Sequence, residues 1–135
     1  MKRFFSLMLI LALCAILAGC SASAPDNLKK AWKVDQSSIG YLRQNVEGMD
    51  SFLVKDDVEL RFDLTGRKAE VYVRRWSQDT ETLKLNWEAD DSTITFSGKD
   101  WSATFDYKMR SSGESMLLYY NDDEYHPIEF YIPNN

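Results

Sequence analysis

The longest regular alternation of apolar and polar residues in the chain covers residues 101–109. The apolar positions are Trp101, Ala103, Phe105, Tyr107 and Met109. Because successive side chains of a β-strand point to opposite faces, this pattern predicts a strand with one buried face and one face in water. The chain is therefore constrained to build a sheet here.

Further segments carry strand patterns and are joined by short turn signals. The expected strands cover residues 31–35, 58–64, 69–76, 83–87, 93–97, 101–109, 115–120 and 127–132. Turn residues separate most of them, as in Thr65-Gly66, Asp90-Asp91 and Asn121-Asp122-Asp123. No strand–helix–strand alternation is present, so the pattern favours sequential hairpins, which form an antiparallel meander.

One segment near the start has a helical period instead. Its apolar residues are Ile39, Leu42, Val46, Met49 and either Phe52 or Leu53. Steps of three and four residues indicate one amphipathic helix, and Ser37 or Ser38 is available as its N-cap.

The expected fold is mostly β, an antiparallel up-and-down meander of about eight strands with one helix near the start. An open meander of this length would leave unpaired edges, and closure into a barrel removes them. The helix would then cover one end. The interior, and with it any ligand site, is expected to be lined by Phe62, Leu85, Trp87, Phe105, Tyr107 and Phe130.

The N-terminus has the order of a secretory signal. Lys2 and Arg3 precede a nearly unbroken apolar run, residues 4–17, which ends in small residues. A helix that spans a bilayer needs roughly 20 apolar residues, so this run is short for a permanent membrane helix. We expect residues 1–19 to be a removed signal peptide.

Leu17-Ala18-Gly19-Cys20 resembles the lipobox of bacterial lipoproteins. That resemblance implies that Cys20 becomes the first mature residue, with diacylglycerol on its thiol and often an acyl chain such as palmitate on its amine. Two or more acyl chains make a lasting anchor. Ser21 stands where aspartate often marks inner-membrane retention in that family, which implies the outer membrane of the cell envelope where the host has two membranes.

The expected organisation is a signal at 1–19, a lipidated cysteine and tether at 20–27, and a single β-rich domain at 28–135. Cys14 leaves with the signal and Cys20 takes the lipid, so no disulfide is expected. The mature chain has 14 basic and 21 acidic residues, because Lys2 and Arg3 are removed. This acidic balance argues against nucleic acid as a partner. We expect a monomer.

The order of signals along the domain resembles small bacterial lipocalin-like domains. The matching signals are Ala31-Trp32-Lys33-Val34, the helical stretch, Phe62-x-x-x-Gly66, Tyr107 and Leu117-Leu118. This resemblance implies a barrel that binds a small apolar ligand. The lipocalin Gly-x-Trp signature is absent, since no glycine lies two residues before Trp32. The missing signature counts against ligand transport more than it counts against the barrel.

Catalytic and metal-binding patterns are weak. His126 is the only histidine and lies beside Asp122, Asp123 and Glu124, which favours a solvated turn over a metal site. Neither a Gly-x-Ser-x-Gly motif nor a glycine-rich phosphate loop occurs. We expect no enzyme activity, no catalytic or metal-binding residue and no cofactor.

Three functions remain as hypotheses. The first is a membrane-anchored, non-enzymatic binding module for a small apolar ligand, and the second is an envelope interaction or assembly lipoprotein that binds a protein partner. The third is a hydrolase whose site residues are unrecognised. Aromatic residues are the candidates for contact surfaces: Tyr72 and Trp76 lie opposite Val71 and Val73 on one strand, so one of the two sets must point away from the core.

Overall fold

A computed structural model of the protein describes residues 24–53, 57–75 and 80–133. The expected signal peptide at 1–19, the lipidation site Cys20 and the aromatic candidate Trp76 lie outside these residues.

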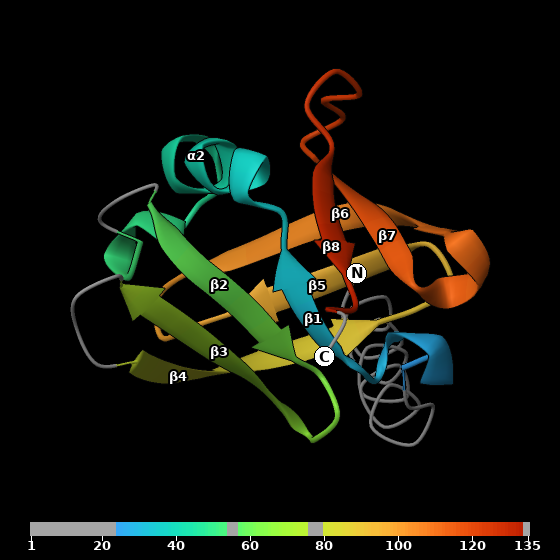
Figure 1. Cartoon of the computed structure of the whole chain (residues 1–135), viewed down its shortest axis with the longest axis horizontal. Coiled ribbons are helices and arrows are strands. Elements are labelled where there is room, and N and C mark those ends of the chain that lie inside the picture. Colours follow the sequence, from blue (N-terminus) through green and yellow to red (C-terminus); the bar gives the residue numbers. More distant parts are fainter. Residues whose placement is uncertain (1–23, 54–56, 76–79, 134–135) are drawn as a thin grey trace, which may run out of the picture.

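Eight antiparallel strands follow one another around a closed barrel, in which the first strand pairs with the last (Figure 1). The strands are β1 (Ala31–Val34), β2 (Val58–Asp63), β3 (Lys68–Arg75), β4 (Thr80–Ala89), β5 (Thr93–Ser97), β6 (Ser102–Arg110), β7 (Ser115–Tyr120) and β8 (Ile128–Tyr131). Each pairs with its neighbours in sequence, so the predicted up-and-down meander and its closure are confirmed.

The helix is shorter than its apolar period suggests. Helix α2 covers Gln36–Asn45, and its N-cap is Asp35, whose carboxylate accepts from the Ser37 amide at 3.2 Å, so neither expected serine is the cap. Gly48 then takes a positive φ of 83° and leads into the 3-10 turn η2 (Met49–Ser51). Met49 stays buried in that turn, which is why the apolar period outlasts the helix.

Another 3-10 turn, η1 (Asp26–Leu28), precedes the barrel and holds the buried Leu28. The indole of Trp32 donates to the Leu28 carbonyl at 2.9 Å. Among the described residues, no helix combines the length and apolar character needed to cross a bilayer.

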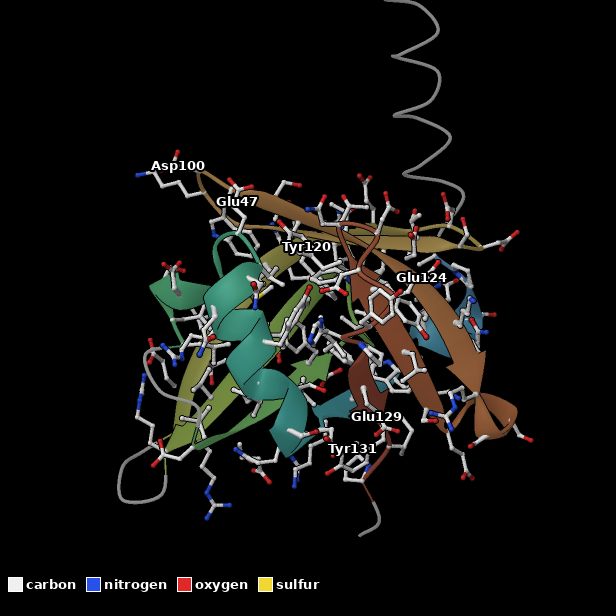
Figure 2. The ribbon with its side chains drawn as sticks, turned by 90° about the horizontal axis from the view of Figure 1, so that it is seen from above. Glu47, Asp100, Tyr120, Glu124, Glu129 and Tyr131 are labelled. Carbon is white, nitrogen blue, oxygen red and sulfur yellow. The ribbon has the colours of Figure 1, made fainter. Side chains whose placement is uncertain are left out.

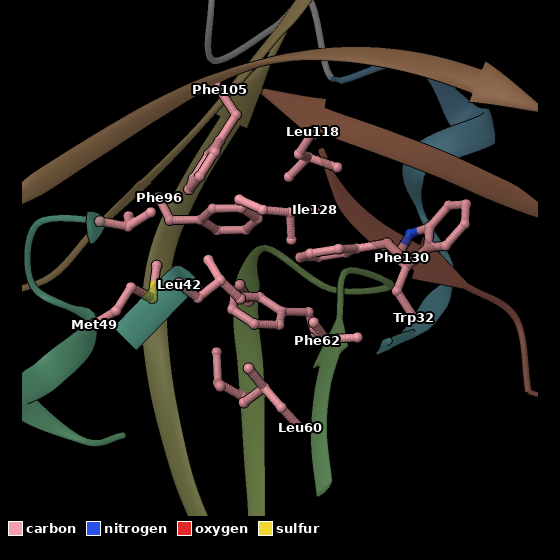
Figure 3. Packing of buried hydrophobic residues seen from close by; sticks show 14 of the residues in the cluster. Trp32, Leu42, Met49, Leu60, Phe62, Phe96, Phe105, Leu118, Ile128 and Phe130 are labelled. Carbon is pink, nitrogen blue, oxygen red and sulfur yellow. The ribbon is translucent and has the colours of Figure 1, made fainter. Parts of the chain in front are cut away.

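The alternating faces of the strands meet in the interior of the barrel. Fully buried residues there include Leu60, Val71, Ile94 and Leu118. Leu42 of α2 and Met49 of η2 pack onto the same cluster (Figure 3). The apolar core therefore runs from the barrel into the helix that covers its end.

The two ends of the barrel carry different connections. What we call the distal end holds residues 35–53 with α2, residues 98–101 and residues 121–127. The basal end holds residues 24–30 with η1, the hairpin turns at 64–67, 90–92 and 111–114, and the chain after β8. In Figure 1, α2 and the loop before β8 lie at the top, whereas the β2–β3 turn and η1 lie at the bottom.

Candidate functional site

Half of the expected lining residues lie at the centre of the barrel. Phe62, Phe105 and Phe130 are each about 1% exposed. Phe62 has its ring centroid 5.0 Å from that of Phe96 and 5.2 Å from that of Phe130, and Phe96 lies 6.1 Å from Phe105. These separations are those of aromatic rings in direct contact. The rings fill the centre against one another (Figure 3).

The other expected lining residues lie toward the basal end. Leu85 and Tyr107 are buried, and the Tyr107 hydroxyl donates to the Asp90 carbonyl at 2.6 Å. Burial and the charge of Asp91 raise the Tyr107 pKa. Trp87 is only half-buried, packs against the edge of the core, and donates from its indole to the Gly66 carbonyl at 3.2 Å.

Two large interior residues were missing from the expected lining. Trp32 and Phe96 are fully buried. Phe96 alternates with Ile94 on a short strand, so its pattern could have included it, whereas Trp32 lies on a four-residue strand with too little pattern for assignment. Both rings belong to the buried core cluster of the barrel.

Burial shows which of the two alternating sets of side chains on β3 faces the core. Val71 and Val73 are fully buried, so Tyr72 points outward, and its hydroxyl donates to the Glu70 carboxylate at 2.5 Å. That contact raises the pKa of Tyr72. The ring is half-buried against the outer face of the sheet, which leaves it little surface for a partner.

The distal connections are tied together by a three-residue cluster, Tyr41, Asp123 and His126, which we call the clasp. Tyr41 on α2 donates to Asp123 Oδ2 at 2.8 Å, and His126 Nδ1 lies 2.9 Å from the same oxygen. The rings of Tyr41 and His126 stack with centroids 5.3 Å apart and planes within 12°. The clasp thus fixes the loop at 121–127 to the helix.

The clasp shifts the titration of two of its members. Burial, followed by the bond to Asp123, raises the pKa of Tyr41 to about 12. The Tyr41 hydroxyl, followed by His126, lowers the pKa of Asp123 below the ordinary carboxyl value. Both shifts favour a neutral phenol that donates to a charged carboxylate at neutral pH.

Further contacts join the other distal connections. The Tyr120 hydroxyl accepts from the Glu47 amide at 3.4 Å, and Ser38 Oγ accepts from the Glu129 amide at 3.1 Å. The indole of Trp101 lies against Gly48, where an added Cβ would come within 2.0 Å of the ring. We call the resulting surface the distal platform: α2, η2, residues 98–101 and residues 121–127.

Tyr125 stands out on this platform. It is 90% exposed, and no other large hydrophobic side chain among the described residues is exposed. Both sides of its loop are held, since the Tyr125 amide donates to Asp123 Oδ1 at 3.1 Å and β8 begins at Ile128. Figure 2, seen from above, shows Glu47 and Asp100 toward one side of Tyr120 and Glu124 toward the other.

The platform is acidic. Among the described residues, the connections at the distal end carry eight carboxylates and two cationic side chains, whereas the connections at the basal end carry four carboxylates and three cationic side chains. The distal carboxylates are Asp35, Glu47, Asp50, Asp57, Asp100, Asp122, Asp123 and Glu124. Within the described ranges, no three histidine, cysteine or carboxylate side chains are grouped so as to hold a metal ion.

The sequence placed Asp122, Asp123, Glu124 and His126 in a solvated turn, and they are in the connection before β8. It did not pair the turn with Tyr41, because that contact joins residues 82 positions apart. No signal in the sequence separates Tyr125 from the other tyrosines. The chain matches no protein-family model, and comparisons with curated proteins and with solved structures give no significant match.

Proposed function

We propose that the protein is a lipid-anchored envelope lipoprotein whose distal platform binds a protein partner. The observation that carries this proposal is Tyr125, a 90% exposed ring on a loop fixed to the helix by the clasp. Tyrosine is enriched among the residues that dominate binding energy at protein interfaces. Because the backbone of this loop is already held by the clasp, little backbone entropy is lost when a partner covers Tyr125.

The charge of the platform indicates the chemistry of the partner. Asp122 and Glu124 lie on the same loop as the ring, and Glu47 and Asp100 lie on other distal connections, on the opposite side of Tyr120 from Glu124. A complementary surface would offer lysine or arginine side chains around a pocket that receives the Tyr125 ring. Such charge pairing raises association rates and excludes acidic partners.

The anchor would set the orientation of this surface. Ala24, the first described residue, lies at the basal end, and four residues of extended chain from Cys20 reach at most about 14 Å. A lipid on Cys20 would therefore hold the basal end beside the membrane. The distal platform, at the other end of the barrel, would face away from the lipid and toward other envelope components.

The partner is tested by photo-crosslinking in the cell that makes the lipoprotein. A photoreactive residue in place of Tyr125 should form an adduct with one discrete protein, and Glu124→Lys with Asp122→Lys should abolish it. The matched control places the same residue at Thr82, an exposed position on the outer face of β4. Equal adducts at both positions, or none at position 125, would refute the platform as a binding surface.

The anchor has its own test. With Cys20→Ser, we expect acyl labelling and membrane retention to be lost while secretion continues, because the thiol that carries the diacylglycerol is gone. A mutant that still fractionates with membranes and still takes up label would exclude lipidation at Cys20. That result would leave the crosslinking at Tyr125 untouched.

A further inference from the structure

A basic hollow lies on the basal end, beside the turn between β2 and β3. Its volume is about 290 Å³, near the lower limit of typical small-molecule sites. Its charged lining residues are Asp63, Arg67, Lys68, Glu70 and Lys84. Three cations face two carboxylates, so the hollow has a positive excess in a chain whose overall charge is negative.

The carboxylates of the hollow are occupied by neutral donors. Asp63 Oδ1 accepts from the Thr65 amide at 3.0 Å and from the Thr65 hydroxyl at 2.6 Å. Glu70 accepts from the hydroxyl of Tyr72. Among the described residues, neither carboxylate forms an ion pair with Arg67, Lys68 or Lys84.

Two of the cations are unengaged. Lys68 donates to the side-chain carbonyl of Asn86. Arg67 and Lys84, in contrast, are exposed and form no hydrogen bond or ion pair within the part of the chain that the structure describes. A guanidinium and an ammonium that share a small hollow are suited to a phosphate, which arginine grips with two parallel hydrogen bonds and lysine meets as a point charge.

The hollow lies where the chain would leave for the membrane. The Leu64 amide, at the start of the β2–β3 turn, donates to the Lys30 carbonyl at 2.9 Å, so this turn is bonded to the segment that leads back toward Cys20. A tether of at most about 14 Å would hold this end close to the lipid surface. Electrostatic attraction to a charged membrane falls off within about 10 Å, a distance this end could reach.

We propose that this hollow binds the phosphate of an anionic phospholipid headgroup through Arg67 and Lys84. The inference rests on the lipid anchoring proposed above, and it adds a second membrane contact that would fix how the barrel stands on the bilayer. The size of the hollow suits a headgroup and excludes an acyl chain. The acyl chains would stay in the bilayer below.

The test uses the chain from residue 20 with Cys20→Ser, which has no lipid of its own. The buried cluster of the barrel lies entirely between Leu28 and Phe130, so this chain contains the whole core. Cosedimentation compares vesicles of phosphatidylcholine with vesicles that also contain phosphatidylglycerol. We expect binding only to the second kind, although the net charge of the protein opposes it.

The decisive variant is Arg67→Gln with Lys84→Gln. Each basic residue near an anionic surface contributes about fivefold to partitioning, so the double variant should bind roughly 25-fold more weakly. Its matched control, Arg74→Gln with Lys99→Gln, removes the same charge from exposed positions toward the distal end. An equal loss in the two double variants, or equal binding to the two kinds of vesicle, would overturn the proposal.

A second measurement locates the contact without any substitution. A spin-labelled phospholipid in the vesicles should broaden the amide resonance of Gly66 on the β2–β3 turn and leave that of Gly48 on the distal platform sharp. Broadening at Gly48 alone would reverse the orientation and refute the site. If inorganic phosphate shifts the Gly66 resonance while the vesicles bind nothing, the hollow is a soluble-phosphate site and the lipid assignment fails.

Failure of the headgroup proposal can be distinguished from failure of the proposed function. Lipidation is read by acyl labelling of Cys20 in the natural chain, and the platform is read by crosslinking at Tyr125. Arg67 and Lys84 take part in neither measurement.

Discussion

The two ends of the barrel are built in different ways from the same strands. At the distal end, Gly48 has a positive φ of 83° and lies against the Trp101 ring, where an added Cβ would come within 2.0 Å. At the basal end, the nearest atom to a Cβ on Gly66 is the Lys68 carbonyl, 3.9 Å away. The distal connections are packed onto one another by rings, whereas no ring covers Gly66 as closely in the β2–β3 turn.

The charges differ in the same way. The distal platform is strongly acidic and presents an exposed ring, whereas the basal end is nearly balanced and contains a hollow with two unengaged cations. A closed ladder of hydrogen bonds and a filled core hold the strands whatever their connections contain. One barrel can therefore carry two unlike surfaces at its ends.

The largest expected effect lies in the core that both ends share. Phe105→Ala removes a ring that is 1% exposed and contacts Phe96 and Tyr120, so it should lower the free energy of unfolding by about 3–5 kcal/mol. Denaturant titration measures this loss. Thr104→Ala, the outward neighbour, loses only a cross-strand hydroxyl contact with Thr95 at 2.8 Å and should cost at most about 1 kcal/mol. Equal midpoints would contradict the strand register.

The next effect separates the ends directly. Gly48→Ala forces a Cβ into the Trp101 ring at a positive φ, and we expect a loss of about 2–3 kcal/mol in the free energy of unfolding together with a changed tryptophan emission. Gly66→Ala, the matched basal substitution, should stay within about 0.5 kcal/mol because its Cβ would have no neighbour closer than the Lys68 carbonyl at 3.9 Å. A Gly66 variant that loses as much as the Gly48 variant would remove the contrast between the ends.

A smaller effect tests the clasp, and it depends on pH. Tyr41→Phe removes the hydroxyl that donates to Asp123 and should cost about 1 kcal/mol at neutral pH. Because the pKa of Asp123 is lowered, its contribution is present above the ordinary carboxyl value of 3.8 and is lost as pH falls through its folded pKa. Because the pKa of Tyr41 is raised to about 12, its contribution is present below 10.0 and is lost as pH rises toward 12.

The difference between wild type and Tyr41→Phe should therefore be greatest from about pH 5 to pH 9 and shrink on both sides. Chemical denaturation across this range gives the profile. A difference that stays constant down to pH 3 would show that the hydroxyl acts by packing and not through the Asp123 carboxylate. Tyr119→Phe controls for the loss of a tyrosine hydroxyl away from the clasp.

The smallest effect on stability belongs to the residue with the largest proposed role in binding. Tyr125 is 90% exposed, so Tyr125→Ala should change the free energy of unfolding by no more than about 0.5 kcal/mol. Thermal or denaturant unfolding of the purified chain checks this. A loss above about 1 kcal/mol would mean that the ring supports the loop, and the platform would then present no free aromatic contact.

The alternation of apolar and polar residues made the meander predictable. The period-two segments placed Phe62, Phe105 and Phe130 on inward faces, because a strand has only two faces and one of them must be buried. Short turns between the strands made antiparallel neighbours the expected pairing, and avoidance of open edges favoured closure. Each of these constraints acts within a short segment or follows from the rule that strand edges must be paired.

These rules did not predict how the connections at the ends of the barrel fold and pack. The helix was predicted to run too far because Met49 and Leu53 stay buried after the chain leaves the helix at Asn45 and turns at Gly48. The sequence assigned the N-cap of this helix to a serine, whereas the N-cap is Asp35. Aspartate and serine both suit an N-cap, so only the backbone geometry decides which of these neighbouring residues takes that position.

The sequence by itself determined the strand order and the inward faces, because both depend on patterns within a few residues, and the lipid anchor stays a prediction from the sequence. Only the tertiary structure decided that Tyr41 would meet Asp123 and His126, that Trp101 would cover Gly48, and that Arg67 and Lys84 would share a hollow. Closure of the barrel brings together connections that are tens of residues apart. Their contacts depend on the stagger of all eight strands, which no local pattern encodes.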